Sequence, residues 1–319
     1  MNEHNNWYGK PYYSLDAYFK NRYGKKCYKI AVDAGFTCPN RDGRLDNKGC
    51  IFCSAGGSGE FAVKVREYSV TEQIRKSLEK MNKETGDGYV IYFQAYTNTY
   101  GSIGYLKKIY VEALETKGVI GISIATRPDC LDDAVLRLLA ELNRIYRARG
   151  KFLWVELGLQ TIHPKTADYI NRHYELGIYE KAIADLQNID IPYITHIILG
   201  LPGETEEMML ETVRYVSNQQ AKPFGVKLQL LHVLKNTALA VDYENGMFDV
   251  MTMESYIDLV AKCLQNIDRD IVIHRLMGDG PKSLLVAPIW SANKKKVLNA
   301  LHHRLKELGV SQGQVINYD

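Results

Sequence analysis

The chain has 319 residues, of which 46% are hydrophobic, so it can bury a large core and is not expected to be disordered. Its 40 basic and 37 acidic residues give a net charge of +3, which neither implies nor excludes a nucleic-acid partner. The polar first ten residues predict no signal peptide, and no apolar run reaches the roughly 20 residues of a spanning helix, so we expect a cytoplasmic protein without membrane association.

Short apolar runs rich in β-branched and aromatic residues alternate with helical patterns along the chain. Strands are expected at 28–33, 89–95, 119–125, 152–158, 193–199 and 225–231. Helices are expected at 70–83, 103–117, 131–149 and 204–219. The helix at 131–149 is the clearest, because its acidic first turn and basic last turn match the helix dipole. This alternation predicts a parallel α/β sheet, wound either as a barrel or as an open sheet.

Polar side chains end several of these strands: Gln94, Arg127, Gln160 and His232. Because chemistry in parallel α/β folds sits at the carboxyl ends of strands, this pattern favours a barrel or partial barrel with a central site. After about residue 236 the alternation weakens into helices near 237–246, 253–268 and 293–308 and a short strand at 271–275. We therefore expect an N-terminal extension (1–27), a barrel (28–236) and a C-terminal extension packed on it (237–319).

Three cysteines lie in the loop after the first strand. Cys38, Cys50 and Cys53 are spaced C-x11-C-x2-C, with glycines and polar turn formers between them that allow three thiolates to approach one centre. Three thiolates leave one iron of a four-iron cluster open to a small molecule. Zinc is the alternative, with Cys27 as a fourth ligand, and it would make the chain a zinc-stabilised binding module.

Blocks spread through the chain add a family resemblance. They include KKCYKIAVDAGFTCPNRDG, GCIFCSAGGSG, ISIATRPDCL, WVELGLQT, HIILGLPGE and IHRLMGDGP, and with others they span residues 22–309. The chain resembles the YhcC-type radical S-adenosylmethionine (radical SAM) proteins. This group is related to the radical SAM domain of the Elongator catalytic subunit and to oxygen-independent coproporphyrinogen oxidase.

The resemblance implies a partial (β/α)6 radical SAM barrel with a C-terminal helical and strand extension. It also implies a [4Fe-4S] cluster on Cys38, Cys50 and Cys53, with S-adenosyl-L-methionine (SAM) on the open iron. An electron from an external donor such as flavodoxin or ferredoxin would pass through the cluster and cleave SAM. The resulting 5′-deoxyadenosyl radical would abstract a substrate hydrogen.

Two features depart from the superfamily pattern. Eleven residues replace the usual three between the first two cysteines, and residues 94–99 (QAYTNT) stand where relatives carry Gly-Gly-Glu. The resemblance implies ribose binding by Gln160 and carboxylate binding by Arg172, whose planar fork matches two oxygens. The complete set of SAM-binding candidates is Phe52, Gln94, Thr97, Asn98, Gln160, Arg172, His196 and Leu201. Strand-end capping is the alternative for Thr97 and Asn98, and a solvated helix charge for Arg172.

The substrate is expected on the far side of SAM, where the candidates are Tyr96, Glu156, Gln229, His232, His274 and Arg275. Glu156 and Gln229 are polar residues in otherwise apolar strands, which is costly unless they are paired. A satisfied core polar group is the alternative for each.

Queuine lysis is the activity associated with the YhcC-type group. In that reaction a radical enzyme cuts the C–N bond that links a 7-deazaguanine base to its cyclopentenediol. We therefore expect a small-molecule substrate, a modified nucleobase, with a carboxylate accepting from its guanine-like edge. Base modification in tRNA, by kinship with Elongator, is the alternative enzyme function and is less favoured, because no basic patch stands out in the sequence.

Overall fold

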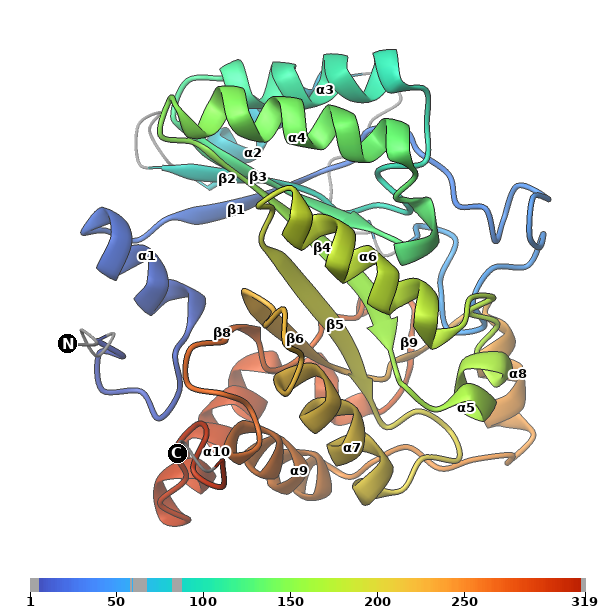
Figure 1. Cartoon of the computed structure of the whole chain (residues 1–319). Coiled ribbons are helices and arrows are strands. Elements are labelled where there is room, and N and C mark those ends of the chain that lie inside the picture. Colours follow the sequence, from blue (N-terminus) through green and yellow to red (C-terminus); the bar gives the residue numbers. More distant parts are fainter. Residues whose placement is uncertain (1–5, 58, 60–67, 82–87, 317–319) are drawn as a thin grey trace.

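The computed structural model describes residues 6–57, 59, 68–81 and 88–316. Its main sheet has seven strands in the order β1-β2-β3-β4-β5-β6-β8, and every neighbouring pair is parallel. The sheet curls into a partial barrel with helices on its outer face (Figure 1). The strands are β1 (Tyr28–Val32), β2 (Tyr89–Phe93), β3 (Val119–Thr126), β4 (Phe152–Gln160), β5 (Tyr193–Leu199), β6 (Gly225–Leu230) and β8 (Val272–Arg275). A separate antiparallel pair joins β7 (Val233–Leu234) to β9 (Leu285–Ala287).

Ten α-helices lie in the described ranges, together with short 3-10 turns at Pro128–Cys130 and Ile289–Ala292. None of these helices combines the length and the hydrophobicity that crossing a membrane requires. The helices are α1 (Leu15–Tyr23), α2 (Val70–Lys80), α3 (Ile103–Glu115), α4 (Asp133–Arg147), α5 (Pro164–Tyr169), α6 (Leu176–Asn188), α7 (Glu206–Ser217), α8 (Ala238–Glu244), α9 (Met253–Gln265) and α10 (Lys294–Glu307).

Local chemistry sets the helix ends. The Asp132 side chain accepts a hydrogen bond from the backbone N–H of Val135 and starts α4, which buries a leucine-rich face. Ser69 and Glu72 form a reciprocal capping box at the start of α2. The predicted end of that helix, at residues 82–83, lies outside the described residues.

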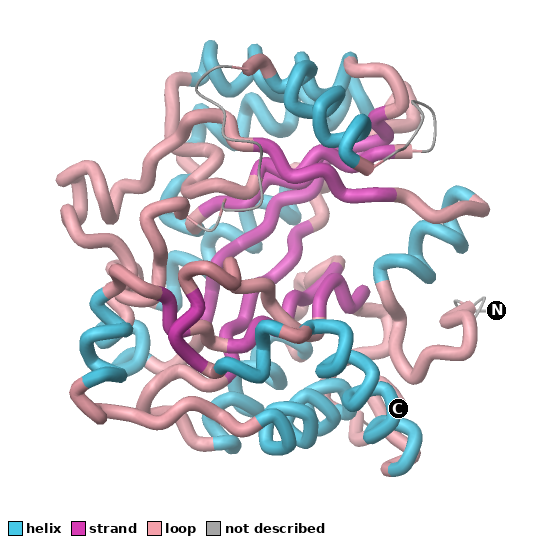
Figure 2. The backbone as a smooth tube through the Cα atoms, turned by 180° about the vertical axis from the view of Figure 1, so that it is seen from behind, coloured by secondary structure: helices cyan, strands magenta, loops and turns pink. Residues whose placement is uncertain are grey.

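The α/β partial barrel predicted from the sequence is confirmed. The six expected strands occur within a few residues of their predicted ends, and the strand expected at 271–275 pairs with β6 as the seventh member of the same sheet. Three helices were not predicted: α1, α5 and α6. Figure 2 shows the concave side of the sheet and both termini at one edge of the molecule.

The interior of the barrel is closed at the amino ends of its strands by an apolar plug. The Trp154 ring of β4 packs against Phe152 and Phe224, with ring centroids 4.1 and 4.6 Å apart, and it also stacks on Phe19 of α1. Because successive strand residues point to opposite faces, the residues that follow Trp154 on the same face, Glu156 and Gly158, continue up the barrel interior. Glu156 and the charged groups around it therefore lie in the half of the barrel nearer the carboxyl ends.

Candidate functional site

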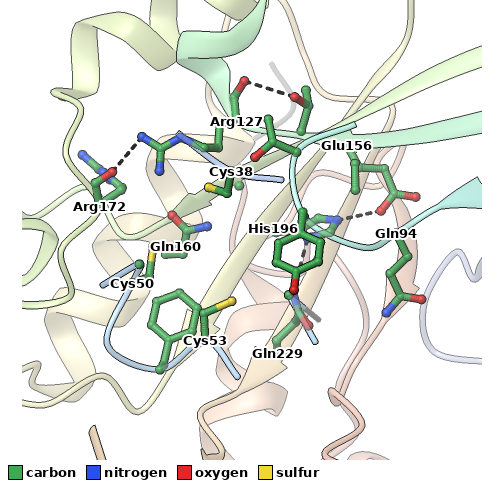
Figure 3. A pocket seen from close by; sticks show the side chains of 18 of the residues that line it. Cys38, Cys50, Cys53, Gln94, Arg127, Glu156, Gln160, Arg172, His196 and Gln229 are labelled. Carbon is green, nitrogen blue, oxygen red and sulfur yellow. Dashed lines mark hydrogen bonds and ion pairs between the residues drawn. The ribbon is translucent and has the colours of Figure 1, made fainter. Parts of the chain in front are cut away.

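A cavity opens at the carboxyl ends of the strands, against the loop that follows β1. Figure 3 shows side chains from this loop and from β4, β5 and β6 converging on it. The described residues that line it and are labelled in Figure 3 are Cys38, Cys50, Cys53, Gln94, Arg127, Glu156, Gln160, Arg172, His196 and Gln229. All three cysteines of the predicted cluster motif therefore reach one cavity.

Hydrogen bonds draw the ends of the loop at residues 38–53, the cysteine loop, together. Arg41 Nη2 donates to the backbone carbonyls of Cys53 and Ser54 at 2.6 and 2.8 Å. The backbone N–H of Gly49 donates to the carbonyl of Asn40 at 2.6 Å. Gly49 has φ +77°, and a Cβ there would lie 2.8 Å from Arg41 Nε, so glycine is required for this closure.

The cysteine loop is also fixed to the barrel and to the C-terminal part of the chain. The backbone N–H of Ile51 donates to the carbonyl of Ile170, and its carbonyl accepts from the N–H of Leu239 at the start of α8. These side chains form a small apolar cluster with Leu201. Leu201 thus packs beneath the loop and is not among the residues that line the cavity, so its predicted contact with SAM stays a prediction.

A layer of charge crosses the barrel between the apolar plug and the cysteine loop. Glu156 is fully buried, and its two carboxylate oxygens accept from Lys29 of β1, Lys227 of β6 and, at 2.5 Å, Ser123 of β3. His196 Nε2 lies 2.6 Å from the same carboxylate. We call Lys29, Glu156 and Lys227 the charged layer. These contacts occupy both oxygens of Glu156. In this structure the carboxylate has no lone pair left to accept a hydrogen bond from the substrate, which is the role predicted for it.

Electrostatics of the charged layer favour an ionised Glu156. Burial opposes ionisation, yet the charges of Lys227 and Lys29 and the hydrogen bond to His196 outweigh it and hold the pKa of Glu156 well below its usual range. Burial lowers the pKa of both lysines, and attraction to Glu156 offsets this only in part. Burial and the charge of Lys227 lower the pKa of His196 to about 4, so this imidazole is neutral at pH 7.

Six of the eight predicted SAM-binding residues line the main cavity: Phe52, Gln94, Thr97, Gln160, Arg172 and His196. Asn98 does not line it. Its Nδ2 donates to the carbonyl of Ala125 at 2.9 Å, and its own carbonyl accepts from Tyr110, which is the strand-end capping given as the alternative.

Arg172 lines the cavity, but its guanidinium is occupied by the backbone. It donates to the carbonyls of Leu159, Thr161 and Tyr174 at 2.6–3.1 Å and is 2% exposed. In this structure Arg172 therefore braces the turn after β4. The alternative of a solvated helix charge is wrong, because the side chain is buried.

The predicted substrate residues divide among three cavities. Tyr96, Glu156, Gln229 and Arg275 line the main cavity. His232 lines an adjoining cavity, and burial lowers its pKa to about 4.

His274 is partly buried and contacts Trp154 and Phe224 edge to face, and neither of its buried ring nitrogens has a hydrogen-bond partner among the described residues. It lines a third cavity, between β1 and β8, with Lys29 and Arg275.

Lys29, Lys227 and Tyr92 are site residues that sequence reasoning missed. The ammonium groups of both lysines lie over the Tyr92 ring, at 4.4 and 4.2 Å from its centroid. Each lysine stands in an apolar strand, as Glu156 does, and that common signal could have identified them.

The zinc alternative finds little support in the positions of the ligands. Cys27, its proposed fourth ligand, packs with Phe19 and Trp154 in the apolar plug at the opposite end of the barrel. Among residues 6–57, 59, 68–81 and 88–316, no three His, Cys, Asp or Glu side chains are placed to hold one metal ion; this includes Cys38, Cys50 and Cys53 and does not distinguish zinc from an iron–sulfur cluster.

Comparison with known proteins agrees with this geometry. Residues 47–216 match the family model of the radical SAM superfamily, and residues 223–307 match the radical SAM C-terminal domain. The chain is 41% identical to the uncharacterised protein YtqA of Bacillus subtilis, over 96% of this chain and 92% of that one. It is 33% identical to the Escherichia coli protein YhcC, over 92% of each chain.

The fold also resembles the archaeal Elp3 of Methanocaldococcus infernus. The TM-score is 0.65 at 17% identity, covering 90% of this chain and 64% of that chain. The chain is therefore a member of the radical SAM superfamily, an enzyme class that uses a [4Fe-4S] cluster and SAM.

Proposed function

We propose that Cys38, Cys50 and Cys53 hold the [4Fe-4S] cluster, and that SAM lies between the cysteine loop and the charged layer. The observation that carries this proposal is that three thiols of one closed loop line the same cavity as polar groups from several strands. When bound, the cluster supplies one electron to SAM, and the 5′-deoxyadenosyl radical so produced takes a hydrogen atom from the substrate.

The residues present fit the cluster. Cys50 is partly buried, and burial together with the neighbouring Cys53 raises its pKa to about 12, so this thiol is protonated unless a cationic centre binds it. Asn40 Nδ2 lies 3.5 Å from Cys50 Sγ and can donate to it, an interaction that tunes iron–sulfur centres. The positive charges of Arg127 and Arg172 lie close to Cys50, which suits a thiolate-rich group.

SAM would be bound and oriented by groups at the strand ends. Gln160, at φ +64°, ends β4 in a conformation that non-glycine residues rarely adopt, and Tyr96 at φ +60° does the same after β2. Such strained residues gather at functional sites. Gln94, Thr97 and Gln160 supply neutral donors and acceptors for the ribose and the amino acid end of SAM.

The substrate would occupy the part of the main cavity that lies next to the charged layer, where amide, phenol and cationic groups face it. Queuine, with release of its 7-deazaguanine base, is the specific substrate that we propose to test first. Gln229, Tyr92 and Lys227 could bind the oxygens and ring nitrogens of such a base, whereas Glu156 is occupied by the lysines. Recognition of the base would therefore depend mainly on hydrogen-bond donors of the protein.

Anaerobic reconstitution with iron and sulfide tests the cluster assignment. Wild type and Cys27→Ser should become brown, bind four irons per chain, as a [4Fe-4S] cluster requires, and release 5′-deoxyadenosine from SAM with dithionite. Cys50→Ser should lose most of the iron and the product. Equal iron in Cys50→Ser and wild type would refute the assignment.

Adding queuine to the reconstituted wild type tests the substrate. Release of the 7-deazaguanine base is expected, and its absence while 5′-deoxyadenosine still forms would reject queuine alone.

A further inference from the structure

Arg275 is a cation without a matched carboxylate in the described part of the chain. Its side chain is 29% exposed and lines the main cavity beside Gln229 and Lys227. The nearest carboxylate oxygen, of Asp279, lies 3.8 Å from Nη2, and that same oxygen is 2.6 Å from Lys294 Nζ. No hydrogen bond joins the Arg275 guanidinium to any described residue, although its fork carries five N–H donors.

The charged layer next to Arg275 also contains more positive than negative charges. Lys29 and Lys227 share the single carboxylate of Glu156, which can balance one of the two ammonium groups. The charge of Arg275 acts on both lysines and helps to lower their pKa values, so the three cations lie close together. All three line the cavity between β1 and β8, which shares Tyr92 and Gln94 with the main cavity.

An excess of buried positive charge is costly unless an anion balances it. A guanidinium fork at a cavity wall fits the two oxygens of a carboxylate or phosphate, and the ammonium groups behind it add attraction in a place where water screens little. A buried lysine can reduce this excess of positive charge by losing its proton. The guanidinium of Arg275 cannot, because arginine stays protonated in proteins.

We propose that Arg275, backed by Lys227 and Lys29, binds an oxyanion of the substrate, a carboxylate or a phosphate. This proposal rests on the part of the proposed function that places the cluster, SAM and the substrate in this cavity. It favours a substrate other than queuine, which has neither a carboxylate nor a phosphate, so the titration and the queuine assay test separate statements. Lys227 precedes Gln229 by two residues on the inner face of β6, one layer nearer the apolar plug. The anion would therefore anchor the inner end of the substrate and turn its other end toward the cysteine loop.

Calorimetric titration of the reconstituted, SAM-saturated protein tests this anion site. The probes are benzoate, its neutral isostere benzamide, and inorganic phosphate, at constant low ionic strength. We expect benzoate or phosphate to bind at least tenfold more tightly than benzamide, and the tighter of the two identifies the oxyanion. Arg275→Gln should weaken that binding at least tenfold, Arg275→Lys less, and the exposed control Arg137→Gln not at all.

Three results would overturn the anion site: no binding of either anion, equal binding of benzamide, or unchanged affinity in Arg275→Gln. Formation of 5′-deoxyadenosine by the wild type is measured on the same samples. If the wild type forms no 5′-deoxyadenosine, the proposed function is rejected, but the titration still shows whether the anion site exists. SAM saturation ensures that the probe does not simply occupy the position of the SAM carboxylate.

Discussion

Replacing Glu156 by glutamine should destabilise the protein far more than an ordinary loss of an ion pair. Glutamine keeps the shape of the side chain but leaves Lys29 and Lys227 as two buried cations without an anion. Removing one partner of a buried ion pair costs about 3–5 kcal/mol, a large part of the roughly 5–15 kcal/mol that holds a typical domain folded. The free energy of unfolding should fall by that amount.

Anaerobic urea denaturation, followed by tryptophan fluorescence, measures the change, since Trp154 lies directly beneath the charged layer. Glu115→Gln is the matched control. Glu115 pairs with Arg149 at 2.5 Å but is 46% exposed, so its loss should lower the free energy of unfolding far less than the loss of Glu156 does. Lys227→Met should cost less than Glu156→Gln, because Glu156 keeps one lysine partner. The double variant Glu156→Gln/Lys227→Met should recover at least half of the loss. A Glu156→Gln effect no larger than that of Glu115→Gln would refute the reasoning.

Three other outcomes follow from the structure. Folding lowers the pKa of His196 from its ordinary 6.5 to about 4, so between these pH values the unfolded chain binds a proton that the folded chain does not. The free energy of unfolding should therefore fall by ~3 kcal/mol from pH 6.5 to pH 4, and the same pH slope in a His196→Gln variant would contradict this. Gly49→Ala should reduce iron uptake on reconstitution, through backbone strain of ~1–3 kcal/mol and contact with Arg41, whereas Gly150→Ala, also at positive φ but in open space, should bind iron normally. Trp154→Ala should lower the free energy of unfolding by ~3–5 kcal/mol in urea titrations, and a smaller loss would mean that the apolar plug is not tightly packed.

Strand positions were the most predictable part of the fold. Each buried parallel strand is a short apolar run, and local composition is enough to locate it. The pairing of β8 with β6 was not predictable, because four residues carry no information about a partner far away in sequence. Helix α6 was missed for a related reason: its weak apolar pattern becomes a helix once one face is buried on the sheet.

The candidate site was predictable where a motif carries the chemistry and less so where the barrel assembles it. The cysteine spacing led directly to three thiols that line one cavity. Glu156 was singled out by its cost in an apolar strand, but Lys29 and Lys227 were not, because a lysine in a strand usually extends to solvent. Their convergence on Glu156 depends on the curl that brings β1, β4 and β6 around a common axis.

Among the described residues, the two edge strands of the main sheet do not pair with each other, so the barrel is not closed. In the described chain β1 and β8 end the strand order without pairing to each other, and Lys29 and Arg275 stand on opposite rims of that gap. The backbone of residues 13–14 pairs with the edge of β8, where the Ile273 N–H donates to the Tyr13 carbonyl at 2.7 Å, and the charged layer links β1 to β6 across the interior. An anion that contacted both cations would therefore join two strands that share no backbone hydrogen bond.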